Sequence, residues 1–504
     1  MKIGPHLKKR EGVWVYSVAK FYITTSIPYV NAAPHIGNVL DSVYADVLAR
    51  YKRQHNFDVR FLTGADEHGA KISRSAAANW VTPQQFVDEN SAKFKNLKKV
   101  LNLSWDDFIR TSDRQRHWPG AQKLWRALKE KGDLYKKIYK GLYCVGHEAF
   151  ITEKDLVDGK CWDHQKAPEV IEEENWFFKL SKYTKEIEAK IKAGELKVVP
   201  EGRAHEILGL LKEGLEDISF SRPAKDLSWG VPVPDDDTQT MYVWAEALIS
   251  YISALGYGSA NEADFKKYWP ADVQVVGKDN LRFHAAIWPG MLLSAGLPLP
   301  KTLFAHGFLT VGGQKISKTV GNVIDPVELV NKYGADAVRY YLLREVPPFD
   351  DGDFSYEKFE ERYNADLANG IGNFAARVLT LGEKLGEIPA DKEKVKPAVE
   401  EKIKITRAEV EEKLAAFKFH EALATIWGLI TFGDEYVNKE QPWKQAEGAA
   451  MDIIFNLVVV LDNVASLLQP FVPNVAQEIT EAIHWTPAKT LKLSKLRILF
   501  PRIV

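Results

Sequence analysis

The sequence of 504 residues predicts an α/β fold, in which a parallel-sheet domain is split by an insertion and followed by an all-helical domain. Near-continuous apolar strands alternate with helices in the first third of the chain, which is typical of parallel sheets covered on both faces. This pattern breaks between residues 135 and 240, and helical spacing prevails after residue 348. The predicted domains are residues 1–134 and 241–361 for the two halves of the sheet domain, 135–240 for the insertion and 362–504 for the helical domain.

Three predicted strands each run into a polar segment. They are apolar, β-branched or aromatic, as buried strands are, and cover residues 21–25, 59–62 and 273–276. Ligands bind at the carboxyl ends of the strands in parallel sheets. The functional site is therefore predicted to be lined by the segments that follow these strands, residues 27–38, 63–69 and 277–279.

The insertion contains both cysteines of the chain, and each begins a Cys-x2-His pair. The pairs are Cys144/His147 and Cys161/His164, with thirteen residues between them. Two thiols and two imidazoles in matched turns suit tetrahedral zinc, so the sequence predicts a structural Zn²⁺ site on these four side chains. A metal-free turn held by Trp162 and a disulfide between the cysteines remain alternatives.

The helical domain is predicted from the spacing of its apolar residues. They recur at the i, i+3, i+4 and i+7 positions that form one face of a helix. Two such sets are Leu423, Ile426, Trp427 and Ile430, and Ile454, Leu457, Val458 and Leu461. Amphipathic helices of this kind pack into a bundle, and the sequence predicts helices to the end of the chain.

The composition is that of a globular protein with balanced charge. The apolar fraction is 45% and the net charge is −1, so any RNA contact would come from local basic patches. No apolar run approaches the ~18 residues of a membrane span, and the N-terminus has no apolar signal core. Because the cysteines are few as well, the sequence predicts a cytoplasmic protein without membrane association.

A histidine and a glycine follow the first strand at a predicted strand-to-helix turn, His35-Ile36-Gly37-Asn38. Gly37 would let a phosphate approach the backbone, and the helix N-terminus behind it favours negative charge. His35 can donate a hydrogen bond to a phosphate oxygen as charge grows in a transition state. Taken alone, the motif would rather indicate a helix start that has a buried histidine.

A second motif, Lys315-Ile316-Ser317-Lys318-Thr319, lies about 280 residues further on, after Gly312-Gly313. The glycines predict a mobile loop on which Lys315 and Lys318 could close over a leaving pyrophosphate. A solvated basic turn is the alternative, because lysine pairs are common. The order and separation of the two motifs, each after a strand, favour the phosphate-binding interpretation of both.

Together the two motifs resemble the ATP-binding signatures of class I aminoacyl-tRNA synthetases. Further segments resemble the methionyl-tRNA synthetases over nearly the whole chain: Ile27-Pro28-Tyr29, Gly64-Ala65-Asp66-Glu67-His68-Gly69, Tyr242-Val243-Trp244-Ala245-Glu246-Ala247, Gly277-Lys278-Asp279, Phe283-His284 and Trp288-Pro289. The resemblance implies a Rossmann-like catalytic domain, a connective zinc-knuckle insertion and an anticodon-binding bundle. The chain departs from the family's usual residues at Asn38 (histidine), His147 (cysteine), Ile316 (methionine) and Thr319 (serine).

The implied activity is ligation of L-methionine to the 3′ end of tRNA(Met), for translation initiation and elongation. The methionine carboxylate would attack the α-phosphate of ATP, with Mg²⁺ on the phosphates. A ribose hydroxyl of the tRNA would then attack the acyl carbon of methionyl-adenylate. The implied catalytic residues are His35, Asn38, Lys315 and Lys318. The implied ATP-binding residues are His35, Gly37, Asn38, Asp41, Gly277, Asp279 and Lys318.

The resemblance also assigns the amino-acid site. Asp66 would bind the α-ammonium group of methionine, and aromatic rings suit a polarisable thioether. The implied side-chain contacts are Ile27, Tyr29, Trp244, Ala247, Tyr251, His284 and Trp288. Without the family, Asp66 could be a helix N-cap and the tryptophans ordinary core residues. Asn280 stands where the family usually has an aliphatic residue, which leaves the fine shape of the site open.

The predicted RNA-binding residues lie in the helical domain. Asn369, Asn373 and Arg377 are four apart, so they share a helix face, and asparagine amides can read base edges. Trp443, after Pro442, could stack on an unpaired base. By resemblance these five residues would bind the CAU anticodon, whereas helix packing and a buried Trp443 are the alternatives. No oligonucleotide-binding domain follows in the sequence, which predicts a monomer.

Three rival interpretations remain open. The first is a synthetase for cysteine or leucine, against which the segments at residues 242–247 and 283–289 argue. The second is a small-molecule nucleotidyltransferase that shares the first motif, which would not need the helical domain. The third is an inactive RNA-binding homologue, which would not need His35, Asp66, Lys315 and Lys318.

Overall fold

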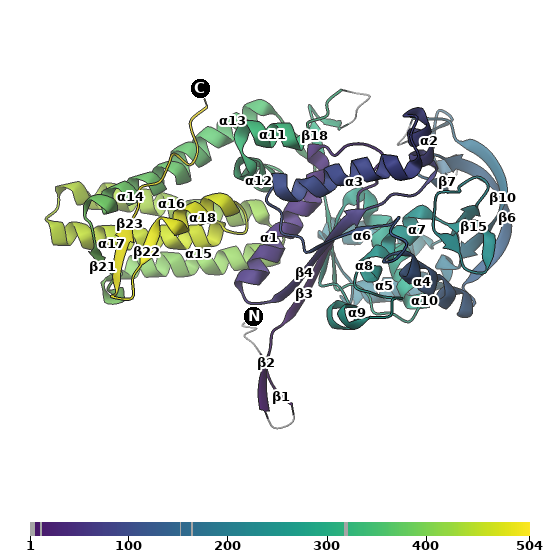
Figure 1. Ribbon diagram of the computed structural model, residues 1–504, viewed down its shortest axis with the longest axis horizontal. Helices are drawn as coiled ribbons and strands as arrows, with labels where there is room; N and C mark the ends of the chain where they lie inside the picture. The colour runs from purple at the N-terminus through teal and green to yellow at the C-terminus, as the bar shows by residue number, and fades with distance from the viewer. Residues whose placement is uncertain (1–5, 11–12, 152, 163–164, 317–320, 504) are drawn as a thin grey trace. The chain divides into compact units, whose positions relative to one another are not determined.

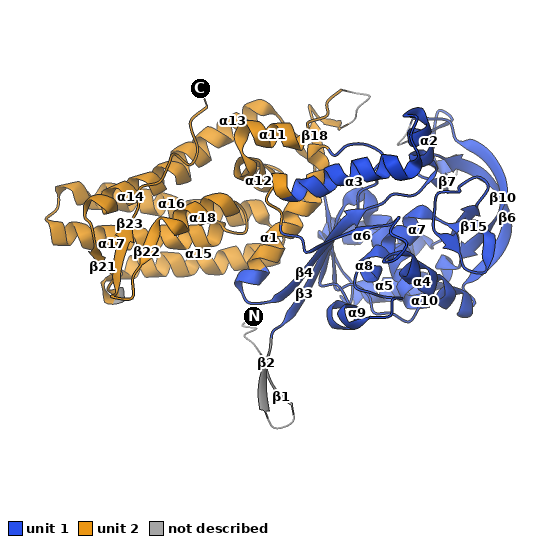
Figure 2. Cartoon of the chain, viewed as in Figure 1, with its two compact units in different colours: residues 1–34, 52–98, 104–306 blue, residues 35–51, 99–103, 307–504 orange. Residues whose placement is uncertain are grey.

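The computed structural model describes residues 6–10, 13–151, 153–162, 165–316 and 321–503. They form two compact units, which Figure 2 colours separately. Unit 1 comprises residues 1–34, 52–98 and 104–306, and unit 2 comprises residues 35–51, 99–103 and 307–504. The chain passes between the units several times, so neither is one continuous stretch of sequence.

The described part of unit 1 is built on a six-stranded parallel sheet of order β11-β17-β16-β3-β4-β5. Figure 1 labels two of these neighbouring strands, β3 and β4. Three of its strands, β3 (Lys20–Thr25), β4 (Asp58–Ala65) and β16 (Val273–Gly277), confirm the predicted ones. The strand order changes direction between β3 and β16, and parallel sheets bind ligands at such a switch point. The other strands are β5 (Asp107–Arg110), β11 (Lys197–Val199) and β17 (Thr302–His306).

Helices cover this sheet through one large apolar core. Tyr22 and Leu62 of the sheet belong to the same buried cluster as Trp125, Trp288 and Met291 of the helices. Burial of apolar surface, worth about 25 cal/mol per Å², is the main stabilising contribution to such a fold. The helices of unit 1 are α2 (Ala70–Ala78), α3 (Pro83–Val100), α4 (Trp118–Glu130), α5 (Thr184–Lys192), α6 (Glu201–Glu213), α7 (Val243–Leu248), α8 (Ser250–Ser253), α9 (Ala263–Tyr268) and α10 (Trp288–Ser294).

The span predicted as an insertion forms antiparallel sheets. Its long strands β6 (Leu134–Cys144) and β10 (Glu169–Phe178) pair with each other, and they are flanked by β7 (Ala149–Ile151) and β12 (Ile218–Ser219). The shorter pairs involve β8 (Leu156–Val157), β9 (Lys160–Cys161), β13 (Ser221–Pro223), β14 (Pro232–Val233) and β15 (Asp236–Met241). One strand from within this span, β11, instead joins the parallel sheet beside β17, which the sequence did not predict. Ahead of the sheet, β1 (His6–Arg10) pairs with β2 (Val13–Ser17).

Unit 2 begins with the predicted strand-to-helix turn, in which a 3₁₀ turn (Ile36–Val39) leads into α1 (Leu40–Gln54). A small sheet combines β18 (Leu309–Val311), β19 (Gln314–Lys315) and β20 (Gly352–Phe354). The other helices of this unit are α11 (Pro326–Tyr333), α12 (Ala335–Arg344), α13 (Tyr356–Arg362), α14 (Asn373–Lys384), α15 (Pro397–Ala415), α16 (Phe419–Glu440), α17 (Glu447–Leu468) and α18 (Pro473–Glu481).

The predicted helical bundle is confirmed. The apolar residues that predicted it lie on α16 and α17, where all are buried except Trp427, which is half-buried. The expectation of helices to the end of the chain is wrong, because β21 (Ile388–Pro389), β22 (Ile483–Trp485) and β23 (Thr490–Leu493) form a small antiparallel sheet. These strands are too short to show a period in the sequence.

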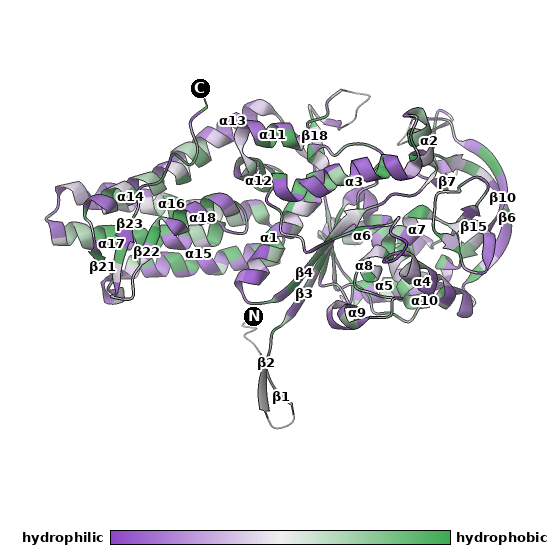
Figure 3. Ribbon diagram, viewed as in Figure 1, coloured by the Kyte–Doolittle hydropathy of each residue, from purple (hydrophilic) through white to green (hydrophobic). Residues whose placement is uncertain are grey.

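Helix α17 is long and apolar enough to cross a membrane, since it has 22 residues and a window of mean hydropathy 1.8 (Figure 3). The expectation that no segment approaches that length is therefore wrong. In the structure 67% of the most apolar stretch of α17 is buried. The helix packs against α14, α15, α16 and α18. Helix α17 is thus a core helix of the bundle. A core helix can be as apolar as a helix that spans a membrane.

Candidate active site

The loops that follow β3 and β4 lie side by side in unit 1. The backbone N–H of Asp66 donates to Pro28 O at 2.9 Å, and Tyr29 pairs with Asp66 in a parallel bridge. Gly64 of β4 has no room for a side chain, because a Cβ atom there would lie 2.3 Å from Ile109 O of β5 and 3.0 Å from Ile27 Cγ2. The structure thus brings together three of the residues expected at the amino-acid site.

The Asp66 side chain is buried with one oxygen unpaired. It is 4% exposed, and its Oδ1 atom has no hydrogen-bond partner among the described residues. Burial raises the pKa of the Asp66 carboxyl well above its usual range, and the Glu246 carboxylate raises it further. Since α2 begins at Ala70, after Gly69, Asp66 is not its N-cap. A cationic ligand group would supply the missing donor and offset the cost of burial.

Aromatic side chains from α7, α8, α10 and the π-helical turn before α10 (Phe283–Ile287) contact one another in two groups. The Tyr251 hydroxyl lies 2.7 Å from His284 Nε2, and the Tyr251 ring centroid lies 6.2 Å from that of Trp288. Trp244 packs edge-on against Phe283, with 5.0 Å between ring centroids. Trp288 is fully buried, and its Nε1 has no hydrogen-bond partner in the described part of the chain. The last expected contact, Ala247, is buried one turn after Trp244 on α7.

The departure at Asn280 leaves the His284 environment intact. His284 Nδ1 lies 3.0 Å from the backbone oxygen of Asn280, so Nδ1 carries the hydrogen and Nε2 accepts from the Tyr251 hydroxyl. The Asn280 amide donates to Asp279 Oδ1 at 3.0 Å. An aliphatic residue would supply the same backbone oxygen, which means that the substitution changes the link to Asp279 and not the orientation of His284.

A buried carboxylate joins the Asp66 loop to α7. Glu246 Oε1 lies 2.7 Å from His68 Nδ1, and Oε2 lies 2.6 Å from His117 Nε2. Burial acts to raise the pKa of Glu246, but the two histidines hold it below its usual value. Sequence reasoning did not assign this network, although His68 and Glu246 lie inside the segments that carry the family resemblance. His117 comes from the start of α4 and has no such signal.

The first phosphate motif has defined donors. His35 Nδ1 accepts from Gly37 N at 3.2 Å, so the ring hydrogen is on Nε2. The Asn38 amide oxygen accepts from His35 N at 3.0 Å, which leaves the NH₂ group of Asn38 as a donor. Ile316 of the second motif lies close by, since a Cβ atom on Gly37 would be 3.4 Å from its side chain. Ile316, in the described start of the second motif, therefore lies beside Gly37 within unit 2.

Only the start of the second motif lies within the described residues. Gly312 and Gly313 have φ values of 62° and 71° and form a two-residue turn between β18 and β19. Lys315 lies on β19 and is exposed, while Lys318 falls outside the described residues. The remaining expected ATP contacts are Asp41 in the first turn of α1, Gly277 at the end of β16 and Asp279 in the turn that follows.

Comparison with known proteins identifies the family. A family model described as class I tRNA synthetases (M) matches residues 21–166 and 151–379, and a model of the anticodon-binding domain of tRNA ligases matches residues 398–497. The methionine–tRNA ligase of Clostridium acetobutylicum is 42% identical to this chain, and the match covers 96% of this chain and 78% of the Clostridium protein. The methionine–tRNA ligase of Brucella suis is 41% identical, and the match covers 92% of each chain. Mycobacterium tuberculosis methionyl-tRNA synthetase in complex with methionyl-adenylate matches at a TM-score of 0.90 and 37% identity, over 96% of this chain and 100% of that one.

The chain belongs to the methionyl-tRNA synthetase family.

The insertion of this synthetase carries the expected knuckle. The ligand atoms of Cys144, His147 and Cys161 lie within 4.8 Å of one another, a donor set that suits zinc. The fourth expected ligand, His164, lies outside the described residues. Both cysteines are free thiols, so the disulfide alternative is wrong. Trp162 is 58% exposed, so it does not hold the knuckle as a core residue.

The bundle of the synthetase presents an exposed tryptophan beside an arginine. The guanidinium carbon of Arg377 lies 5.2 Å from the Trp443 ring centroid, and Arg377 Nη2 donates to Asn438 Oδ1 at 2.7 Å. Trp443 is 49% exposed, so the alternative of a buried tryptophan is wrong, whereas Pro442 is buried. Asn438 was missed from the sequence, because nothing there shows that it meets Arg377.

The two expected asparagines are exposed on a neighbouring element. Asn369 lies in a π-helical stretch, Tyr363–Gly372, and Asn373 is the first residue of α14. π-Helical turns inside α-helices are frequent at functional sites, and both asparagine side chains are exposed here. Both amides are therefore accessible to a ligand without displacing packed side chains.

Proposed function

We propose that this synthetase ligates L-methionine to tRNA(Met) in an ATP-dependent reaction that proceeds through methionyl-adenylate. The unpaired Oδ1 atom of Asp66 carries the proposal, because a buried carboxylate beside aromatic rings suits an amino acid that has an α-ammonium group and a thioether. The amino-acid site is assigned to Ile27, Tyr29, Asp66, Trp244, Ala247, Tyr251, His284 and Trp288.

In the first step, the methionine carboxylate attacks the α-phosphate of ATP and pyrophosphate leaves. We assign His35 Nε2 and the Asn38 NH₂ group to phosphate oxygens, and Lys315 and Lys318 to the leaving pyrophosphate. Asp41, Gly37, Gly277 and Asp279 are assigned to the other ATP contacts, and Mg²⁺ on the phosphates would add positive charge. None of these residues forms a covalent bond, so the enzyme acts by positioning and charge stabilisation. A ribose hydroxyl of the tRNA then attacks the acyl carbon and AMP leaves.

ATP–pyrophosphate exchange with each of the twenty amino acids tests this function. We expect exchange with methionine alone from the wild type, and loss of that exchange in Asp66→Ala. Exchange with cysteine or leucine would reassign the amino acid. No exchange from folded protein with Mg²⁺ present would leave an RNA-binding homologue. If deletion of residues 362–504 left tRNA aminoacylation unchanged, the assignment of that region to tRNA would be wrong.

We also propose a structural zinc ion held by Cys144, His147, Cys161 and His164. Zinc would hold the two turns of the knuckle together. Without it, the turns are joined by a small apolar cluster of Cys144, Ile151 and Cys161, which stabilises them only weakly. Elemental mass spectrometry should find about one zinc per chain, and Cys161→Ser should lose it and unfold at a lower temperature. His205→Ala, at an exposed histidine of α6, is the matched control and should keep the metal. Unchanged zinc content in Cys161→Ser would refute the site.

We propose that Asn369, Asn373, Arg377, Pro442 and Trp443 contact the anticodon, with Asn438 orienting Arg377. Stacking of a base on an aromatic ring contributes about 1–3 kcal/mol, so Trp443→Ala should weaken tRNA binding by roughly 5- to 150-fold. Methionine-dependent pyrophosphate exchange should be unchanged. Trp485→Ala, at another exposed tryptophan of unit 2, is the control and should leave tRNA affinity unaltered. Equal losses in both variants would mean general destabilisation instead.

Four further features remain proposals. The domain boundaries at residues 134, 240 and 361 separate the two catalytic segments, the connective insertion and the bundle. Mg²⁺ accompanies ATP, the protein acts as a monomer, and it resides in the cytoplasm. Sedimentation of the purified protein would decide the oligomeric state.

A further inference from the structure

Glu148 is a buried acidic residue that the reaction scheme leaves without a role. It directly follows the knuckle histidine, His147, and is 2% exposed. Its backbone has a φ of 49°, in the left-handed region that side-chain-bearing residues rarely adopt. A buried carboxylate held in an unfavourable backbone conformation implies compensating contacts around it.

Both oxygens of Glu148 are fully used by donors from elsewhere in unit 1. Oε1 accepts from the Tyr29 hydroxyl at 3.0 Å and from Lys71 N at 2.6 Å. Oε2 accepts from Ala70 N at 3.2 Å and from the Tyr143 hydroxyl at 3.0 Å. Two of these donors are the first backbone N–H groups of α2, where a negative charge is favourable. One carboxylate therefore fixes both the start of α2 and a side chain of the amino-acid site.

The Tyr29 hydroxyl and the Glu148 carboxylate are packed closely against Gly69. A Cβ atom on Gly69 would lie 2.7 Å from the Tyr29 hydroxyl oxygen and 3.0 Å from Glu148 Oε1. Gly69 has a φ of 112° and ends the loop that carries Asp66. The Tyr29 hydroxyl, Glu148 and the Asp66 loop are thus packed as one group, so displacement of Glu148 would move both ends of the amino-acid site.

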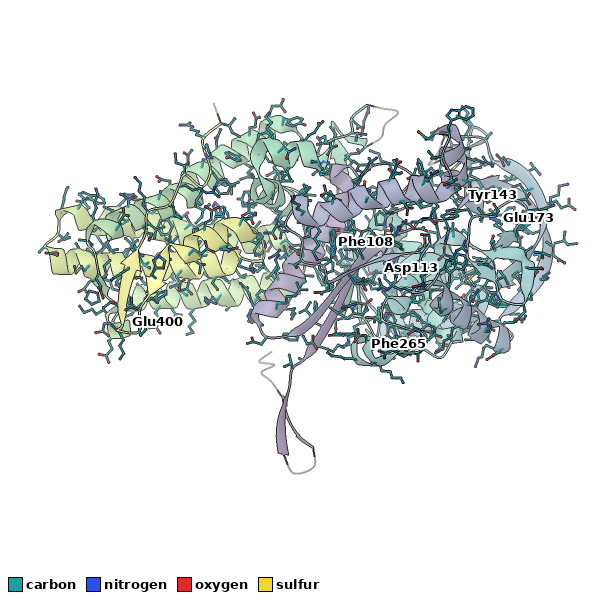
Figure 4. The ribbon with its side chains drawn as sticks, in the orientation of Figure 1. Phe108, Asp113, Tyr143, Glu173, Phe265 and Glu400 are labelled. Carbon is teal, nitrogen blue, oxygen red and sulfur yellow. The ribbon has the colours of Figure 1, made fainter. Side chains whose placement is uncertain are left out.

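On its other side Glu148 is tied to the insertion. Its N–H donates to Val145 O at 3.4 Å, which closes the knuckle turn. Arg222 Nη2 lies 3.4 Å from Glu148 O, and Arg222 also pairs with Glu173 at 2.9 Å. Figure 4 labels Tyr143 and Glu173, which belong to the paired strands β6 and β10. The position of Glu148 is therefore set by the fold of the knuckle and of this sheet.

We propose that Glu148 is a positioning residue that couples the cysteine/histidine knuckle to the methionine site by holding Tyr29. The inference rests on the proposed function, since it assigns a role within that site. When the knuckle is correctly folded, Glu148 orients the Tyr29 hydroxyl and the start of α2 for the bound amino acid. When the knuckle is loosened, methionine affinity falls while the phosphate-binding residues keep their geometry.

The test compares methionine KM, ATP KM and kcat in pyrophosphate exchange for Glu148→Gln and Glu148→Ala. Loss of a hydrogen bond to a charged group predicts that methionine KM rises by roughly 10-fold in Glu148→Ala. Glu148→Gln, which keeps one acceptor oxygen, should show a smaller rise. ATP KM and kcat should change little. The methionine Kd, measured by calorimetry, should follow methionine KM.

Two further variants separate positioning from general stability. Asp133→Asn removes another buried carboxylate of unit 1, which is bound by Lys182, Tyr183 and Ser294; it should lower the unfolding temperature and leave methionine KM unchanged. Tyr29→Phe should raise methionine KM, and combining it with Glu148→Ala should add little to the effect of Glu148→Ala alone, because both changes remove the Tyr29–Glu148 hydrogen bond.

The coupling to the knuckle is tested with Cys161→Ser. This variant should weaken methionine binding, and its combination with Glu148→Gln should weaken it no further. If Glu148→Ala raises methionine KM no more than Asp133→Asn does, or if the effects of Cys161→Ser and Glu148→Gln multiply, the inference is overturned. Absence of methionine-dependent exchange in the wild type would instead refute the proposed function, so the two failures are distinguishable.

Discussion

Asp66→Asn is expected to weaken methionine binding severely while leaving the fold at least as stable as the wild type. Removing one partner of a buried charge pair costs about 2–5 kcal/mol, which corresponds to roughly 30- to 4,000-fold weaker methionine binding. In the free protein, however, Asp66 Oδ1 has no partner among the described residues, and its charge destabilises the fold. Calorimetric titration with methionine and thermal unfolding of the free protein measure the two effects.

The pH dependence follows from the raised pKa of Asp66. Its burial raises the pKa above the usual value, so the folded state holds this proton more tightly than the unfolded state does. The ionised carboxylate therefore lowers stability as pH rises through the window between the two pKa values. Methionine binding requires the ionised form, so methionine Kd should increase as pH falls through the raised pKa, above the ordinary aspartate value of about 3.9.

The matched control for this prediction is Glu89→Gln, at an exposed acidic residue of α3. It should change neither methionine Kd nor its pH profile. Should Asp66→Asn bind methionine within a few-fold of the wild type, the carboxylate would not be the ammonium partner. A fall in unfolding temperature with methionine binding intact would assign Asp66 a purely structural role.

His35→Ala is expected to slow adenylate formation by roughly 10²–10³-fold, the loss seen when a transition-state hydrogen-bond donor is removed. The reason lies in the tautomer, since His35 Nδ1 accepts from Gly37 N and the hydrogen is on Nε2. Methionine Kd should remain unchanged, because the amino-acid site is built from other residues. Stopped-flow measurement of adenylate formation, beside calorimetry for methionine, separates rate from binding.

His35 also accepts a hydrogen bond at the start of the 3₁₀ turn, so His35→Asn distinguishes its two roles. Asparagine is a good helix cap. His35→Asn should therefore have the unfolding temperature of the wild type but the slow adenylate formation of His35→Ala. Full recovery of rate would show that the histidine acts only as a cap. His55→Ala, at an exposed histidine that follows α1, should behave as the wild type in both measurements.

The parts of the fold that could be predicted from the sequence are those with a local signal. Buried parallel strands need long apolar runs, so β3, β4 and β16 and the loops that follow them were found directly. The three residues of β11 carry no period, and their place beside β17 is decided by packing. The same holds for β21, which pairs with β23 about a hundred residues further on, while β22 and β23 form a local hairpin of strands too short to show a period.

The residues of the candidate site also differ in whether the sequence alone could identify them. Asp66 and His35 each lie in a short motif of consecutive residues, so the pattern is visible in the sequence. His117 and Glu148 contribute through contacts with elements more than 70 residues away, with Glu246 and with Lys71, and no local pattern marks either residue. The side chains assigned to ligands could therefore be predicted from the sequence, whereas the side chains proposed to orient them needed the folded chain.

The return of β11 to the parallel sheet means that the insertion is not a detachable module. Because β11 covers the outer edge of β17, excising the whole of residues 135–240 would leave unpaired backbone groups along that strand. A shortened relative could dispense with the outer antiparallel strands yet would have to retain the stretch around Lys197–Val199. Insertions and deletions among related sequences should therefore occur in the loops between residues 135 and 240 and should leave β11 intact.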